Sequence, residues 1–123
     1  MPSNLLSIGG YAFTKCISMN SISIPNNTQS IGSHAFFYCT ELTDIKLADN
    51  LLYLGGYAFK NCTKLTNINI PNKVQEIAAT TFLNSAITSV TLPNSIVKIN
   101  RDRIDEFFSA YLNIIMPENL IIH

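Results

Sequence analysis

The sequence predicts an α/β solenoid, in which short coils of chain stack on one another along one axis. A pentapeptide recurs, its Phe residues fall at a fixed interval of 23, and apolar residues keep the same offsets around each copy. The copies read Gly-Gly-Tyr-Ala-Phe at 9–13, Gly-Ser-His-Ala-Phe at 32–36, Gly-Gly-Tyr-Ala-Phe at 55–59 and Ala-Ala-Thr-Thr-Phe at 78–82. Such a period is typical of units that bury their apolar side only against their neighbours.

Other positions keep the interval, which excludes an accident of composition. They are an aliphatic residue before each pentapeptide (Ile8, Ile31, Leu54, Ile77 and, after 22, Ile99), a cysteine (Cys16, Cys39 and Cys62, with Ser85 in the fourth slot), and a proline (Pro25, Pro71, Pro93 and Pro117, with Ala48 once). The chain is therefore expected to be a single domain, 1–123, with about five coils of 22–24 residues and with repeats over about 5–99.

A short strand is expected between the cysteine and proline positions of each coil. Apolar residues hold fixed offsets there, and the last two of each set alternate with one polar residue: Met19, Ile22, Ile24; Leu42, Ile45, Leu47; Leu65, Ile68, Ile70; and Ile87, Val90, Leu92. This alternation is typical of a strand with one buried face.

The repeat ends after Ile99, and a different element is expected there. Apolar residues at i, i+3, i+4, i+7 and i+8 predict an amphipathic helix: Ile104, Phe107, Phe108, Tyr111 and Leu112. Terminal repeats of solenoids are usually atypical, so residues of about 100–123 are expected to form a C-terminal cap with a capping helix. The alternative is a membrane-surface helix, which its two arginines, three acids and lack of lysine disfavour.

The repeat unit resembles the BspA-like class of leucine-rich repeats. The segment Ile-Gly-Ser-His-Ala-Phe-Phe-Tyr-Cys-Thr-Glu-Leu-Thr-Asp-Ile-Lys-Leu at 31–47 is a close match, and 54–71 is closer. The resemblance implies a right-handed leucine-rich repeat superhelix with a parallel strand ladder on one face, short helical turns on the convex side, and a surface used for protein contacts. Many members of that family are exported or cell-surface proteins, to which adhesion is most often attributed.

Charge and motif content argue against other function classes. Eight basic and eight acidic residues leave no electrostatic footprint for nucleic acid. The glycines before the pentapeptide Phe lack a phosphate-loop pattern and are expected at bends where a side chain would clash with the next coil. No cofactor is expected.

The three cysteines are expected to be structural. An interval of 23 fits neither a zinc site nor a redox pair, which need close spacing. It places one thiol at the same point of three coils, and the resemblance to leucine-rich repeats implies that the side chain in this slot satisfies backbone groups at a bend. Metal and disulfide interpretations remain as alternatives.

Catalysis is not expected. His34 occupies the slot of Tyr11 and Tyr57, which indicates an outward or half-covered aromatic position. An enzyme using Asp102, Asp105 or Glu106 with His34 is the alternative, but no pattern pairs a nucleophile with a base. The catalytic and metal-binding residue sets are therefore expected to be empty.

A polar strand face is the expected protein-binding site. Residues flanking the inward positions form two columns: Ser21, Ser23, Asp44, Lys46, Asn67, Asn69, Ser89 and Thr91. This surface suits hydrogen-bonded protein recognition, since it lacks the Trp, Tyr and Arg anchors of hot spots. The sequence thus favours a non-enzymatic protein-interaction module, such as a cell-surface adhesin or a fragment of one; an intracellular scaffold or regulatory protein is the alternative.

The sequence also gives expectations for the cellular location and the oligomeric state of the chain. No apolar run approaches a membrane span, and the first residues lack the pattern of a signal peptide. The resemblance suggests the cell surface, and the chain taken as complete suggests the cytoplasm. A homodimer through a terminal repeat or the C-terminal segment is expected because uncapped ends invite pairing.

Overall fold

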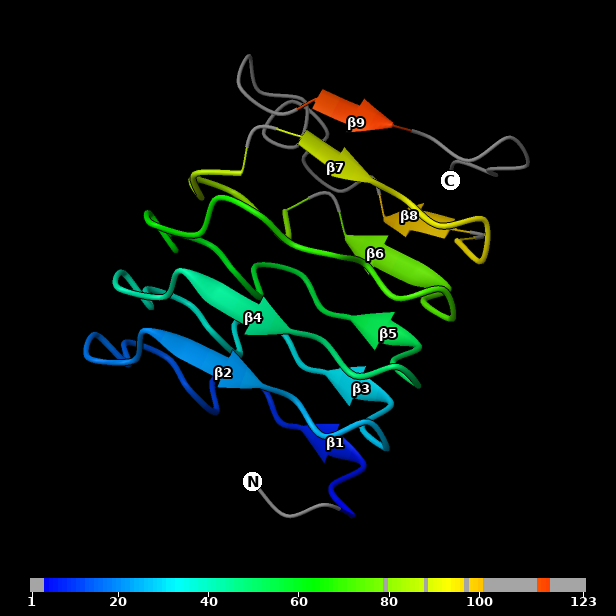
Figure 1. Ribbon diagram of the computed structural model, residues 1–123, viewed down its shortest axis with the longest axis horizontal. Helices are drawn as coiled ribbons and strands as arrows, with labels where there is room; N and C mark the ends of the chain where they lie inside the picture. Colours follow the sequence, from blue (N-terminus) through cyan, green and yellow to red (C-terminus); the bar gives the residue numbers. More distant parts are fainter. Residues whose placement is uncertain (1–3, 79, 88, 97, 101–112, 116–123) are drawn as a thin grey trace.

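The structure is a computed structural model that describes residues 4–78, 80–87, 89–96, 98–100 and 113–115. Its strands stack in a column from the N-terminal to the C-terminal end of the chain (Figure 1). We number the repeats by their pentapeptides: the first covers 9–31, the second 32–54, the third 55–77 and the fourth 78–99. Each repeat lies against the one before it, and no helix occurs within the described ranges.

A five-stranded parallel sheet joins the repeats at one side, to the right in Figure 1. Its strands are, in order, β1 (Ser7–Ile8), β3 (Ser30–Ile31), β5 (Tyr53–Leu54), β6 (Glu76–Ala78) and β8 (Lys98–Asn100). Ile8 pairs with Ile31, and Ile31 with Leu54, so the register offset is 23 residues. Between β6 and β8 the offset becomes 22, where Ile77 pairs with Ile99. The repeat interval in the sequence is therefore the strand register of this sheet.

The predicted strand ladder forms a second column and is interrupted. Strand β2 (Ser21–Ser23) pairs with β4 (Asp44–Lys46), and β7 (Ser89–Thr91) pairs with β9 (Asn113–Ile115), all in parallel. The intervening segment, 67–69, is not a strand, so the two pairs are separate sheets. The continuous sheet thus lies at the aliphatic position before each pentapeptide, where no strand ladder was predicted.

The expected short helical turns are absent from the described residues. Amides of Tyr11, Phe13 and Lys15 donate to carbonyls of the second repeat, at 3.1, 2.8 and 2.7 Å, while the alternate amides of residues 12, 14 and 16 bond three residues back. A helix would use every amide for bonds four residues back within its own segment. The segments 9–19, 32–42, 55–65 and 80–87, here called the turn segments, are therefore chains of turns joined across repeats. The predicted α/β class is therefore wrong for the described residues, which contain strands and turns but no helix.

These turns need the left-handed backbone region at residues other than glycine. Tyr11, His34 and Tyr57 have φ values of 60°, 59° and 58°, and the slot four residues later repeats this, with Asn61 at 61°. Such a conformation costs an L-residue roughly 1–2 kcal/mol. The hydrogen bonds between repeats offset that cost, because the amides of Tyr11, His34 and Asn61 each donate to a carbonyl of the neighbouring repeat.

Glycine is required at the bends for space. A Cβ at Gly32 would lie 2.6 Å from the nitrogen of Gly10, and one at Gly55 would lie 2.6 Å from the nitrogen of Ser33. These distances confirm the predicted clash, although the obstacle is the preceding repeat. A Cβ at Gly9 would meet nothing within 4 Å.

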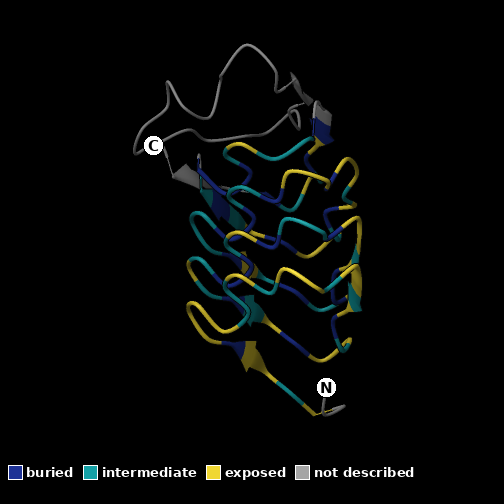
Figure 2. Ribbon diagram, turned by 90° about the vertical axis from the view of Figure 1, so that its left-hand side faces the viewer, coloured by how far each residue is buried: buried dark blue, intermediate teal, exposed yellow. Residues whose placement is uncertain are grey.

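The core consists of ladders of identical side chains. The rings of Phe13, Phe36, Phe59 and Phe82 stack nearly parallel, with centroid distances of 5.2, 5.3 and 5.8 Å. Phe36 and Phe59 are fully buried, whereas Phe13 is half-buried. Figure 2 shows the same gradient, because exposed residues gather in the lowest repeat. Interior repeats therefore hold the better-packed core.

The predicted C-terminal cap lies largely outside the described residues. Of about 100–123, the structure describes Asn100, which ends β8, and β9. The capping helix and the acids Asp102, Asp105 and Glu106 fall in the undescribed part. The handedness and curvature of the superhelix stay predictions.

Candidate functional site

The predicted strand face is exposed wherever its side chains are described. Ser21, Ser23, Asp44 and Lys46 lie on β2 and β4 and are exposed, and their register places Ser21 beside Asp44 and Ser23 beside Lys46. The exposed residues Asn67 and Asn69 follow in the third repeat, and Thr91 is exposed on β7, which also contains Ser89. The apolar residues between them, such as Ile45, are half-buried and pack against the core. The first three repeats thus present the small polar surface that the sequence predicted.

A shallow hollow marks the interruption of this face. It has a volume of about 210 Å³ and is lined by Asp44 and Ile45 of β4 and by Asn67, Ile68 and Asn69 of the neighbouring segment. The polar groups among its lining residues are the carboxylate of Asp44 and the amides of Asn67 and Asn69. A hydrogen-bonding side chain matches these groups.

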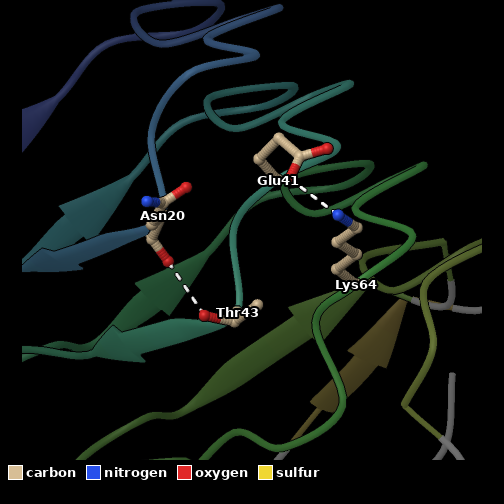
Figure 3. Close-up of polar contacts among 4 residues, drawn as sticks. All are labelled: Asn20, Glu41, Thr43 and Lys64. Atoms are coloured by element: carbon tan, nitrogen blue, oxygen red, sulfur yellow. Dashed lines mark hydrogen bonds and ion pairs between the residues drawn. The ribbon is translucent and has the colours of Figure 1, made fainter.

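Polar side-chain contacts join adjacent repeats at the edge of the strand face. The Thr43 hydroxyl donates to the backbone carbonyl of Asn20 at 3.1 Å, and the Lys64 ammonium pairs with Glu41 at 2.7 Å (Figure 3). Both pairs join residues 23 apart. The ion pair is about half exposed on each side, so it contributes at most about 1 kcal/mol. These side chains therefore help to keep adjacent repeats in register, and they are less available for binding another protein.

A second surface lies on the turn segments, which run from the five-stranded sheet to the left-hand side of Figure 1, the side that faces the viewer in Figure 2. Rings of Tyr11, His34 and Tyr57 stack there, with centroid distances of 4.6 and 4.8 Å. Tyr11 is 57% exposed, and the other two rings are half-buried. We call these three rings the aromatic row. It confirms His34 as a half-covered aromatic position.

Three more side chains adjoin the aromatic row. Phe37 meets the His34 ring edge-on at 5.3 Å, and Tyr38 meets Phe37 edge-on at 4.6 Å. The Lys60 ammonium lies 5.3 Å from the Tyr57 ring centre and 5.7 Å from that of Phe37. This cluster was not predicted from the sequence. The sequence did contain a signal for it directly after the second and third pentapeptides, because Phe37 and Lys60 follow the core Phe in successive repeats.

The surroundings of His34 favour the neutral form of its ring. Its Nδ1 lies 2.8 Å from the Ser33 hydroxyl. Partial burial, with a smaller effect of the Lys60 charge, lowers the pKa of His34 below the ordinary value of 6.5.

The cysteines have the structural role that the sequence predicted. The Cys39 thiol donates to the carbonyl of Phe13 at 3.0 Å, and the Cys62 thiol donates to that of Phe36 at 3.1 Å. Burial raises the pKa of Cys39 to about 11 and that of Cys62 to about 12. All three thiols are free, and Cys16 is half-buried. The two interior thiols are thus protonated hydrogen-bond donors, which is a poor state for a nucleophile or metal ligand.

The described ranges contain no cluster of metal-binding side chains. There, no group of three or more His, Cys, Asp and Glu side chains is placed to hold a metal ion. The same part of the chain contains no helix of the length and apolarity that a membrane span needs.

The repeat geometry and its ladders define a leucine-rich repeat protein. The family model for the BspA type leucine rich repeat region matches residues 1–119 in six copies, and the chain belongs to that family. The family is typically non-enzymatic and serves as a protein-interaction module.

Solved structures share this fold. A leucine rich cell surface protein from Faecalibacterium prausnitzii A2-165 is similar with a TM-score of 0.81 and 28% identity, over 96% of this chain and 31% of that one. The Treponema pallidum (T. pallidum) leucine rich repeat protein has a TM-score of 0.78 and 23% identity, over 99% and 71%. A leucine-rich repeat protein from Bacteroides ovatus ATCC 8483 has a TM-score of 0.71 and 16% identity, over 99% and 37%.

The chain thus spans about a third of two of these proteins. A comparison with curated protein sequences gave no match.

Proposed function

We propose that this chain is a non-enzymatic module that binds a protein partner through the strand face. The observation that supports this most is the exposed double column on β2, β4 and the segment 67–69, built on a repeat scaffold. Small polar side chains on regular backbone recognise a partner by shape and hydrogen bonding, and a solenoid extends such contacts over several repeats.

The hollow between β4 and the segment 67–69 is the proposed centre of that contact. The carboxylate of Asp44 and the amides of Asn67 and Asn69 line it and would fix the orientation of a bound side chain through hydrogen bonds. Lys46, exposed on the same strand, gives the face its one cation beside Asp44 in the second repeat. Both charges are the natural positions for testing specificity.

We propose the cell surface as the place of action, with adhesion as the biological role. The similar Faecalibacterium prausnitzii protein is described as a leucine rich cell surface protein, and this likeness supports the proposal. Antibody labelling of intact, unpermeabilised cells of the source organism tests it. Labelling that requires permeabilisation would favour the intracellular scaffold instead.

Position-resolved cross-linking tests the binding face. A photoreactive phenylalanine analogue replaces Asn69 in one variant and Asn72, exposed in the following turn, in the control. In cells that make the protein, we expect a discrete cross-linked species from position 69, which the charge-swapped pair Asp44→Lys and Lys46→Asp abolishes. Equal cross-linking from both positions, or no effect of the charge swap, would contradict the proposal.

A further inference from the structure

The turn segments concentrate charge of one sign. They contain Lys15, Lys60 and Lys64 and one acid, Glu41, which is a net charge of +2 in a chain whose formal net charge is zero. Glu41 pairs with Lys64. In the described part of the chain, Lys15 and Lys60 have no ion-pair partner, so this side offers two cations to an acidic group.

Aromatic residues gather on the same side in fixed orientations. Neighbours in adjacent repeats hold the three rings of the aromatic row, and edge-on contacts with His34 and Tyr38 hold Phe37. Lys60 is held over two of the rings. Tyrosine is a preferred hot-spot residue, and an ordered side chain loses little rotamer freedom when it binds. The strand face has no such anchors.

Ring geometry decides which ligand chemistry fits. Both faces of His34 are covered, since Tyr11 and Tyr57 stack on it at 4.6 and 4.8 Å. Nucleobases need a free ring face for stacking. Ring edges carry partial positive charge, so a row of edges beside two lysines attracts carboxylates and backbone carbonyls. The exposed chemistry therefore complements an acidic polypeptide.

We propose that the surface formed by Tyr11, His34, Phe37, Tyr38, Tyr57 and Lys60 binds an acidic, extended segment of another protein. The segment runs along the stack of repeats, with a carboxylate at Lys60 and backbone carbonyls against the tyrosine edges. Lys15, exposed in the first repeat, takes a second carboxylate. This site is on the turn segments and is separate from the strand face, so it stands independently of the proposed function.

The test is a titration of the isotope-labelled full chain, followed residue by residue by amide chemical shifts. The probe is a capped peptide of alternating glutamate and proline, and the matched control is the lysine and proline peptide. We expect saturable shifts at the amides of residues 11, 34, 57 and 60 with the acidic peptide, weakening as salt rises. Equal binding of the basic peptide, or acidic-peptide shifts confined to residues 21–23, 44–46 and 67–69, would overturn the proposal.

Two variants and one charge-matched control sharpen the result. Lys60→Gln is expected to weaken acidic-peptide binding roughly two- to fivefold, the range of an exposed ion pair. Tyr57→Thr is expected to weaken it at least about fivefold, and the fold already accepts Thr80 in the corresponding slot of the fourth repeat. Lys73→Gln removes the same charge at an exposed position outside both surfaces, and this variant is expected to bind as the parent does. If Lys73→Gln weakened binding as much as Lys60→Gln, net charge alone would explain the attraction, and the proposed site would be overturned.

The same titration separates other ligand classes. A sialylated oligosaccharide and an oligothymidylate are titrated in parallel with the acidic peptide. The proposal expects neither to shift the aromatic-row amides at concentrations where the peptide does. Shifts with either ligand and none with the peptide would assign the surface to that class.

Discussion

At the scale of the single residue, the interior cysteines stabilise the contact between adjacent repeats. The Cys62 thiol is fully buried and donates to the carbonyl of Phe36 in the preceding repeat. Cys62→Ala removes this donor and leaves a small cavity, so we expect a loss of about 1–3 kcal/mol of unfolding free energy. Urea denaturation of both proteins measures it. Cys16→Ala, in the half-buried first slot, is the control and should cost less.

His34 gives the chain a specific pH dependence. Its pKa is lower in the folded chain than the ordinary 6.5, so the unfolded chain binds the proton more tightly. Stability therefore rises with pH through the interval between the folded pKa and 6.5, and it falls on acidification. His34→Tyr, which copies the sister slots, should flatten this part of the curve. Melting temperatures of both proteins between pH 7.5 and 5.5 test this, and identical slopes would exclude His34 as the source.

The repeated slots also show which side-chain environments could be predicted from the sequence. The Tyr11, His34 and Tyr57 slot was predicted as outward or half-covered, since one slot in a repeat has one environment. The placement of Lys60 over Phe37 and Tyr57 was not predicted. It depends on how side chains of adjacent repeats lean toward each other, and spacing along the chain contains no such information.

At the scale of the element, the bend before each turn segment sets how closely repeats approach. A methyl group at Gly32 would lie 2.6 Å from the backbone nitrogen of Gly10, which has no side chain to move aside. Gly32→Ala should therefore cost about 1–3 kcal/mol. Gly9→Ala is the matched control, because a Cβ there meets nothing within 4 Å. Thermal unfolding distinguishes them; equal stabilities would contradict the close approach.

Strands and turns differ in how well the pattern predicted them. Alternation located β2, β4 and β7 correctly, but 67–69 has the same alternation and is not a strand. Both flanking residues there are asparagines, which are depleted in strands. The short helical turns were expected from the family resemblance alone, and the left-handed backbone at Tyr11 and His34 gives no sequence signal that would have corrected this expectation. Hydrogen bonds to the neighbouring repeat select that backbone, and a local pattern does not encode them.

At the scale of the whole molecule, the first repeat is the exposed end of the described stack. Phe13, Cys16 and Met19 are half-buried, while their counterparts in the second and third repeats are buried; Leu6 and Ile17 are each 61% exposed. We predict that this chain forms a homodimer that buries this apolar surface or the C-terminal segment. Light scattering across a concentration series, with and without reductant, measures the mass. A monomer mass at every concentration would exclude the dimer.

Both proposed surfaces depend on one central claim, that the repeats stack in register through their turn segments. The amides of Phe36 and Phe59 donate to Ala58 and Thr81 at 2.8 Å, and both rings are fully buried. Hydrogen exchange resolved by residue tests this claim most directly. We predict strong protection of the Phe36 and Phe59 amides and weaker protection of the Phe13 amide at the exposed end. Exchange at Phe36 and Phe59 as fast as in an unfolded chain would contradict the stacked structure and both surfaces with it.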